Sequence, residues 1–360
     1  MEIQSWKAQV EKELKGKSIE NLIQQIEDGV FTQPLLNEVQ IASGVSFRAK
    51  HSWSIQQSFK TKLPELWNAL ALEALQGGVN KLVIPQCWNS SDLLIALQNI
   101  WVAYVEFVLP AENYSDYHNA LVQLAAEQAK GDLQPTHKYI ISSESAYQLA
   151  ASHAEQLAHL MLMGIEQIER TNESLDHELA HIQFEVHVSN QILIEIAKIR
   201  ALRKLWSHVL SNSSLEHTCS NHCYISAITD RNFQATTDSD NNLIRSTIQA
   251  CAAVLGGANA VEVSPMESFS NEDHSNHLRW SRNIQHLLAE ESYLNQYSDA
   301  AMGSFSIEDL TNQLVQQAWK IMKEFQVAQA LMNHMKNMAD QRIQTKTEQV
   351  VVGQNKYVRS

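Results

Sequence analysis

The chain has 360 residues, of which 44% are apolar and 19% charged, and its formal net charge is −13. Such a length allows one large core or two ordinary domains, and the negative charge argues against a nucleic acid or an anionic membrane as partner. Residues 1–17 are charged and amphipathic rather than a signal peptide, no apolar run reaches membrane-spanning length, and the four cysteines form no disulfide framework, so a cytoplasmic setting is expected.

The chain divides into a helical start and a longer region in which strands and helices alternate. Residues 4–28 have the apolar spacing of one or two amphipathic helices, and residues 29–50 are expected to be a connector. The predicted strands are residues 51–59, 81–84, 103–109, 138–141, 183–188, 223–228, 260–263 and 303–307. The predicted helices are residues 64–76, a short helix capped by Ser90, 112–130, 144–170, 190–210, 241–255, 274–297, 308–325 and 326–346.

Regular alternation of strand and helix predicts a parallel sheet, and eight units favour an α/β fold of the (β/α)8 TIM barrel type with an N-terminal helical arm. The alternative is an open Rossmann-like sheet, but no G-x-G-x-x-G or Walker A loop follows any predicted strand. We expect residues 1–45 to form the arm and connector, 46–325 the barrel, and 326–360 a C-terminal helix and tail.

Residues 183–206 predict one strand–turn–helix unit. Gln183 to Val188 alternates polar and apolar residues, and apolar residues recur at helical spacing from Ile192 to Trp206. Periodicity alone is typical of a core βα unit in any α/β protein.

The residues of this unit are more specific than its periodicity. EIAKIRALRKLW, Glu195 to Trp206, closely resembles a segment of the methylmalonyl-CoA mutase family. Ser5 to Ser18 is similar to the N-terminal arm of the family's small subunits. Other segments resemble the family in the same order, namely Ser52–Phe59, Ala71–Ile84, Asn241–Pro265, Ser281–Leu294, Gly303–Trp319 and Val350–Tyr357. The resemblance covers nearly the whole chain and implies an acyl-CoA-mutase-like barrel.

The sequence departs from the family's active chain at positions that carry chemistry there. Glu144 and Ser145 stand where the active chain has a Tyr-His pair, and Ile228 where it has a Gln. An acidic pair of the family reads Glu267-Ser268 here, so Ser268 replaces the second carboxylate. The D-x-H-x-x-G signature, whose His ligates cobalt in the active chain, occurs nowhere. The resemblance therefore implies degenerate active-site positions at Glu144, Ser145, Ile228 and Ser268, and no catalytic residue is assigned.

Two functions follow as hypotheses from this resemblance. In the first, the chain is the non-catalytic small subunit of a heterodimer whose large subunit binds adenosylcobalamin, and this chain alone holds no cofactor. In the second, it is a barrel-only acyl-CoA mutase that acts with a separate cobalamin-binding protein. Binding of an acyl-CoA to this chain is left open by both. Glu195, Arg200, Arg203, Arg282 and Glu291 belong to the resembling segments and are predicted to be scaffold residues.

The sequence also contains two motifs that resemble metal sites. HELAH, His177 to His181, fits the H-E-x-x-H pattern of zinc peptidases, but the next strand begins directly after it and shortens the helix that the motif requires. HTCSNHC, His217 to Cys223, brings two His and two Cys together, at a spacing tight for one tetrahedral zinc. A loop that happens to be rich in Cys and His is the simpler interpretation, and no metal site is predicted.

Overall fold

The computed structural model describes residues 3–36, 52–128, 132–134, 136–170, 179, 181–211, 223–232, 234–235, 240–266, 271–347, 350–352 and 354–357.

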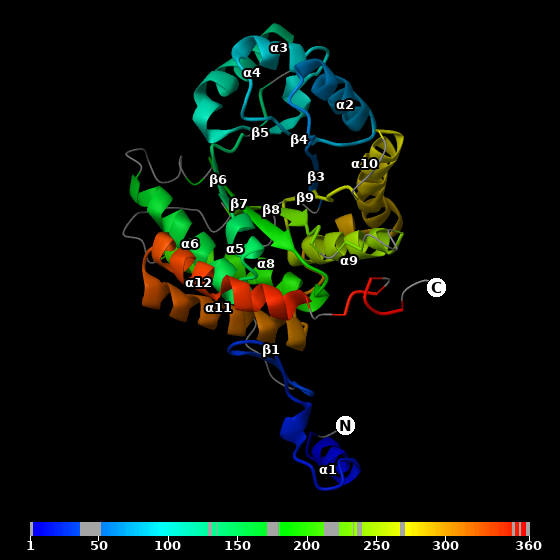
Figure 1. Ribbon diagram of the computed structural model, residues 1–360, viewed down its shortest axis with the longest axis vertical. Coiled ribbons are helices and arrows are strands. Elements are labelled where there is room, and N and C mark those ends of the chain that lie inside the picture. The colour runs from blue at the N-terminus through cyan, green and yellow to red at the C-terminus, as the bar shows by residue number, and fades with distance from the viewer. Residues whose placement is uncertain are drawn as a thin grey trace.

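A parallel seven-stranded sheet forms the centre of the molecule (Figure 1). Its strands are β3 (Ser54–Gln57), β4 (Lys81–Val83), β5 (Glu106–Val108), β6 (Tyr139–Ser142), β7 (Ile182–Val188), β8 (Tyr224–Thr229) and β9 (Ala260–Glu262). The first and last of these pair with each other, in the order β5-β4-β3-β9-β8-β7-β6. A parallel bridge between Val108 and His137, just before β6, joins the two edges. The predicted TIM-barrel-like α/β class is therefore confirmed.

The strand predicted at residues 303–307 is wrong, because this segment opens a helix, α11 (Phe305–Phe325). Four residues of alternating Ser, Phe and Ile look the same in a strand and in the first turn of a helix. An eighth strand could not insert between β3 and β9, because Ile55 of β3 pairs directly with Val261 of β9. The sheet of the described residues thus closes with seven strands where the sequence suggested eight.

Helices cover the outside of the barrel (Figure 1). They are α2 (Pro64–Gln76), α3 (Ser90–Ala96), α4 (Tyr114–Gln128), α5 (Glu144–Gln148), α6 (His153–Arg170), α8 (Ile192–Ser211), α9 (Asn241–Gly256), α10 (Asn271–His286), α11 and α12 (Ala328–Thr347). The single helix predicted at 144–170 is two helices, since Ala150 adopts a left-handed φ of 52° between them. The helix predicted at 274–297 ends at His286 and continues as a π turn, η5 (Leu287–Glu291).

The N-terminal arm contains a β-hairpin that the sequence reading missed. After α1 (Ile3–Glu13) and the 3₁₀ turn η1 (Ile19–Leu22), strands β1 (Gln24–Glu27) and β2 (Val30–Thr32) pair antiparallel. Asp28-Gly29 forms the turn, and Gly29 has a φ of 77° that favours glycine. The hairpin lies against the body while α1 projects away from it, at the end marked N (Figure 1).

The predicted strand–turn–helix unit at 183–206 is confirmed and lies in the largest apolar core. Phe184, Val186 and Val188 point outward from β7 and are fully buried under the surrounding helices. Trp206 of α8 packs edge-on against Phe184, with ring centroids 4.9 Å apart. In the described part of the chain, no helix is long and apolar enough to cross a membrane.

Candidate functional site

The interior of the barrel is polar where such barrels are usually filled by branched apolar side chains. Lys81, which is 0% exposed, donates from Nζ to Gln183 Oε1 (2.8 Å) and to the Tyr224 hydroxyl (3.0 Å). That hydroxyl donates to Glu106 Oε2 (2.8 Å), and Ser54 Oγ donates to Glu106 Oε1 (2.7 Å). Burial lowers the pKa of Lys81 to about 8, although the nearby carboxylates act to raise it. The part of the barrel axis near the amino ends of the strands is therefore occupied by a hydrogen-bonded network.

A second polar layer lies closer to the carboxyl ends of the strands. Ser226 Oγ donates to Gln56 Oε1 (3.0 Å), and Gln56 Nε2 donates to Glu262 Oε2 (2.9 Å). Ser58 Oγ donates to the other carboxylate oxygen of Glu262. Both Gln56 and Glu262 are buried and also line the cavity above them. This layer forms the floor of the mouth of the barrel.

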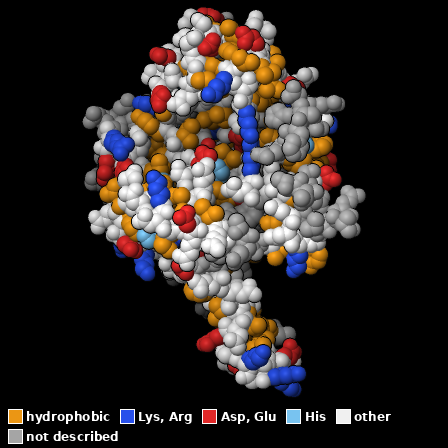
Figure 2. Space-filling model, in the orientation of Figure 1, with side chains coloured by type: hydrophobic (Ala, Val, Ile, Leu, Met, Phe, Trp, Pro, Cys, Tyr) orange, Lys and Arg blue, Asp and Glu red, His pale blue; other side chains and the backbone are white. Residues whose placement is uncertain are grey.

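The mouth, at the carboxyl ends of the strands, contains a cavity of about 440 Å³. This volume lies within the usual range of small-molecule sites, about 300–1,000 Å³. Figure 2 shows the molecule hollowed near the centre of this face. The lining residues are Gln56, Ser58, Val83, Val108, Ile140, Glu144, Tyr147, Gln148, Glu185, His187, Ile228, Thr229, Asp230, Arg231, Asn232, Glu262 and Ser264. Active sites of such barrels lie at this end, so the cavity is the candidate site.

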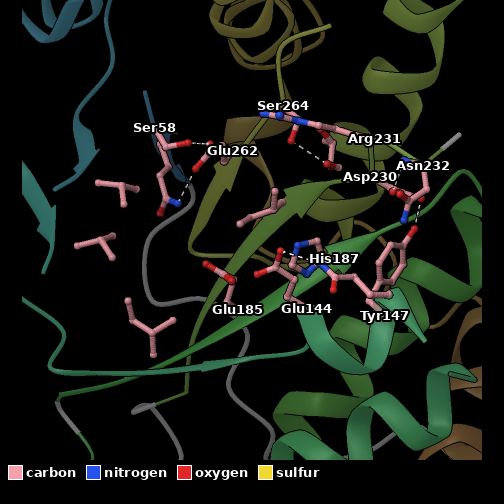
Figure 3. Close-up of a pocket in the computed structure, with 17 residues that line it drawn as sticks. Ser58, Glu144, Tyr147, Glu185, His187, Asp230, Arg231, Asn232, Glu262 and Ser264 are labelled. Carbon is pink, nitrogen blue, oxygen red and sulfur yellow. Dashed lines mark hydrogen bonds between the residues drawn. The ribbon is translucent and has the colours of Figure 1, made fainter. Parts of the chain in front are cut away.

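Glu185 stands on the β7 wall of the cavity, beside Glu144 and across from Glu262 (Figure 3). Burial raises the pKa of this carboxyl, the hydrogen bond from Ser142 Oγ (2.6 Å) opposes the rise, and the neighbouring carboxylates of Glu262 and Glu144 add to it. A carboxyl group shifted in this direction exchanges protons closer to neutral pH than an ordinary one.

His187 follows Glu185 on the same wall. Its ring stacks on Tyr147 with centroids 5.3 Å apart, and its Nδ1 lies 3.4 Å from Ser143 Oγ. Burial, together with the nearby Lys198, lowers the pKa of His187 to about 4, so the imidazole is neutral at pH 7. The Tyr147 hydroxyl donates to Asp230, which is itself buried. The side chains on this side of the cavity are therefore already stacked on or hydrogen-bonded to one another.

The structure brings two of the predicted degenerate positions to the cavity. Glu144, the first residue of α5, and Ile228 of β8 both line it. Ser145 is exposed next to Glu144 and is not among the lining residues. Ser268 lies outside the described residues. Glu144 and Ile228 thus lie at the mouth, and the assignment of all four positions as degenerate active-site positions remains a prediction.

The sequence reading missed the acidic lining at Glu185, Asp230 and Glu262. For Glu185 a signal was present, because Gln183, Glu185 and His187 alternate with the apolar residues of β7. In a barrel whose outer face is covered by helices, the polar set of such a strand faces the axis. For Asp230, which follows β8, no periodic signal exists, since loop residues have no fixed repeat.

The described residues show no group of three or more His, Cys, Asp or Glu arranged to hold a metal ion. Of the HELAH motif, His177 and Glu178 lie outside the described residues, and His181 Nδ1 is 3.0 Å from the carbonyl oxygen of Thr136. Of HTCSNHC only Cys223 is described, buried in front of β8, and burial raises the pKa of its thiol to about 11. The expectation that neither motif holds a metal therefore remains a prediction.

Comparison with known proteins identifies the family. The family profile described as "Methylmalonyl-CoA mutase" matches residues 99–360. A methylmalonyl-CoA mutase small subunit of Streptomyces virginiae is 29% identical over 185 residues, which are 51% of this chain and 30% of that protein. A methylmalonyl-CoA mutase of Escherichia coli is 29% identical over 247 residues, 63% of this chain and 34% of that protein. A small subunit of Porphyromonas gingivalis is 27% identical over 173 residues, 46% of this chain and 28% of that protein.

The matches therefore extend over about a third of the length of these curated relatives. The profile, by contrast, covers well over half of this chain, from just after α3 through the C-terminal tail, and includes the four positions that line the mouth on β7 and β8, namely Glu185, His187, Ile228 and Thr229. Together with the parallel barrel and the resembling segments, it shows that the chain belongs to the methylmalonyl-CoA mutase family of isomerases.

Proposed function

We propose that this chain is the non-catalytic small subunit of a heterodimeric, adenosylcobalamin-dependent methylmalonyl-CoA mutase, in which it supports the catalytic large subunit. Two of the relatives carry the small-subunit name. The observation that carries the proposal is the charge of the mouth. Glu144, Glu185, Asp230 and Glu262 line the cavity, and Arg231 is the one cationic Lys or Arg side chain among its described lining residues.

Such a mouth disfavours the substrate of the family's name. A methylmalonyl group carries a free carboxylate, and coenzyme A carries phosphates, so both parts are anionic. Two like charges about 5 Å apart repel by about 3 kcal/mol at an effective dielectric constant of about 20. Hydrogen bonds of Lys81 with Gln183 and Tyr224, and of Tyr224 with Glu106, also join side chains of different strands across the axis beneath the cavity, which opposes the entry of an elongated ligand there. Both features support a role in which this barrel does no chemistry.

Among the described lining residues of the mouth, one imidazole is present that could ligate the cobalt of a corrin cofactor. His187 is the imidazole in the lining, and its ring is engaged by Tyr147 and Ser143. Ile228 offers no hydrogen bond from its side chain. These residues do not fit adenosylcobalamin as a resident group, which supports a cofactor held by the partner chain.

The second candidate is a barrel-only acyl-CoA mutase that acts with a separate cobalamin-binding protein. The cavity itself favours it, because a volume of about 440 Å³ with polar walls can accept a small ligand.

Co-purification and one variant separate the two functions. Tagged chain isolated from its native lysate should bring down a large mutase chain with a cobalamin domain, identified by mass spectrometry. In the reconstituted complex, Glu185→Gln should leave turnover within about twofold of wild type, a change in barrier below about 0.5 kcal/mol. Recovery of a small cobalamin-binding protein alone, or a hundredfold loss of turnover in Glu185→Gln, would contradict the non-catalytic role.

A further inference from the structure

One carboxylate of the N-terminal hairpin, that of Glu27, binds the start of α6. Glu27 Oε1 accepts a hydrogen bond from the Ala154 backbone N–H (3.0 Å), and Oε2 accepts one from the His153 N–H (2.8 Å). The same Oε2 lies 2.7 Å from His153 Nδ1. These contacts place a negative charge at a helix N-terminus, where the helix dipole favours it. They join residues that are 126 positions apart in the sequence.

The other ring nitrogen of His153 reaches α8. His153 Nε2 lies 3.3 Å from Glu195 Oε1, so the imidazole bridges two carboxylates. Burial alone would lower the pKa of His153, but its hydrogen bonds with Glu195 and Glu27 outweigh burial and raise it to about 9. At pH 7 the ring is therefore an imidazolium that donates to one carboxylate from each nitrogen.

From Glu195 the contacts continue to the mouth of the barrel. Glu195, which is 0% exposed, accepts from the Ser189 N–H through Oε1 (2.9 Å) and pairs with Lys198 Nζ through Oε2 (2.6 Å). Lys198 Nζ donates to the carbonyl oxygen of His187 (2.6 Å). His187 and Ser189 flank the end of β7, and His187 lines the mouth cavity. An unbroken series of contacts thus links the arm to the site.

These four side chains, Glu27, His153, Glu195 and Lys198, form a network with two negative and two positive charges at pH 7. On the opposite side of α6, Glu155 faces Arg342 and His334 of α12 rather than His153. Removing the hairpin's charge leaves the network with an excess positive charge and withdraws one of the two partners that keep His153 protonated. Glu195 would then lose its charged bridge while it stays buried, which is costly for an ion.

Further hydrogen bonds attach the hairpin to α11 through neutral side chains. Gln313 of α11 accepts from the Phe31 N–H (2.8 Å) and donates to the Phe31 carbonyl (3.0 Å). Gln317 donates to the Gly29 carbonyl (3.3 Å). The charged and the neutral attachments can therefore be removed separately.

We propose that the N-terminal hairpin and the mouth of the barrel are coupled through the network of Glu27, His153, Glu195 and Lys198. A macromolecule that pulls the hairpin off the body releases Glu27 from α6, weakens the Glu195 bridge, and frees the backbone at the end of β7. Docking of the arm is thereby transmitted to the wall that carries His187. All of these contacts lie within this chain, so the coupling does not depend on which partner draws the arm away.

Amide hydrogen exchange of the full chain at pH 7, read by mass spectrometry, tests the coupling. Glu27→Gln should speed exchange roughly tenfold in residues 24–32 and also in residues 187–190, where the Ser189 N–H reports on Glu195. The matched control is Gln313→Ala, which loosens the same hairpin without touching Glu27, His153, Glu195 or Lys198. It should speed exchange in residues 24–32 only.

Two results would overturn the coupling. One is faster exchange confined to the hairpin in Glu27→Gln, and the other is an equal effect of Gln313→Ala on residues 187–190. If Glu27→Gln does not fold, wild-type protein at rising pH takes its place, with exchange corrected for the intrinsic rate. The stabilisation from a histidine whose folded pKa is raised is complete below about 6.5 and is lost as pH rises through about 9. Residues 24–32 and 187–190 should then lose protection together, and loss in the hairpin alone would refute the coupling.

Discussion

At the scale of single residues, the two arginines of α8 that the sequence predicts to be scaffold residues are buried or partly buried in the helical shell and have partners there. Arg200 of α8 donates to Asp299 (2.6 Å) and to Glu308 of α11 (2.6 Å). Arg203 donates to the carbonyl oxygens of Cys223 (2.7 Å) and Gly257 (3.0 Å). None of these groups is among the described residues that line the mouth. This geometry suits the scaffold role predicted for them.

Replacing Arg200 tests that role. Arg200→Ala leaves Glu308, whose side chain is 2% exposed, without its cationic partner, and breaking such a buried pair costs about 3–5 kcal/mol. We expect a lower melting temperature and a lower yield of assembled complex, with unchanged turnover per assembled complex. Thermal unfolding and activity normalised to the purified complex measure the two effects.

The matched control for Arg200 is Arg170→Ala, because Arg170 pairs with Glu166 at 3.5 Å while its own side chain is 73% exposed. A surface pair of this kind contributes less than about 1 kcal/mol, so the control should melt near wild type. A hundredfold loss of turnover in Arg200→Ala with unchanged melting would mean that the barrel does chemistry.

At the scale of elements, the close approach of α6 to β7 and α8 depends on Gly164. A Cβ atom at this position would lie 2.8 Å from Trp206 and 3.3 Å from Phe184, two rings that pack on each other in the core. Neither ring can withdraw easily, because both are fully enclosed. Glycine is therefore required here by packing rather than by backbone conformation.

Gly164→Ala should lower the free energy of unfolding by about 1–3 kcal/mol, the usual cost of overpacking a core. Alanine is the better helix former by about 1 kcal/mol, and this preference opposes the loss. Urea unfolding measures the difference, with Glu169→Ala at an exposed position of the same helix as control. A net gain of stability in Gly164→Ala would show that α6 does not approach β7 and α8 this closely.

At the scale of the whole molecule, the parallel strands form a barrel whose mouth and axis carry acidic and polar groups that are engaged with one another. A scaffold can tolerate such a mouth, because the outer helices and the barrel wall hold their shape independently of what the cavity binds. The proposed small-subunit role places the cofactor on the partner.

Isolated chain titrated with adenosylcobalamin should therefore show no micromolar binding, because the sequence lacks D-x-H-x-x-G and the mouth presents Ile228 and an engaged His187. The visible absorbance of the cofactor after gel filtration measures binding. The reconstituted complex with a large mutase chain, which should retain the cofactor, is the positive control. Micromolar retention by the isolated chain would refute a cofactor site confined to the partner.

The sequence by itself determined the barrel class, the family resemblance, and the places of the strands from β3 to β9, because period-2 and period-3.6 patterns reflect local burial. It placed Glu144 and Ile228 at degenerate positions, and the structure brings both to the mouth. It did not determine the number of strands, since closure depends on whether β9 pairs with β3, which is a contact across the whole barrel.

Only the tertiary structure decided which charges meet. Glu27 and His153 are 126 residues apart in the sequence, and His153 and Glu195 are 42 residues apart. Their side chains are nevertheless in contact. No local pattern encodes such contacts, because they depend on how the hairpin, α6 and α8 are brought together by packing of their apolar faces. The same holds for the acidic mouth, where Glu185 and Glu262 come from separate strands and line one cavity only because β7 and β9 both pair with β8.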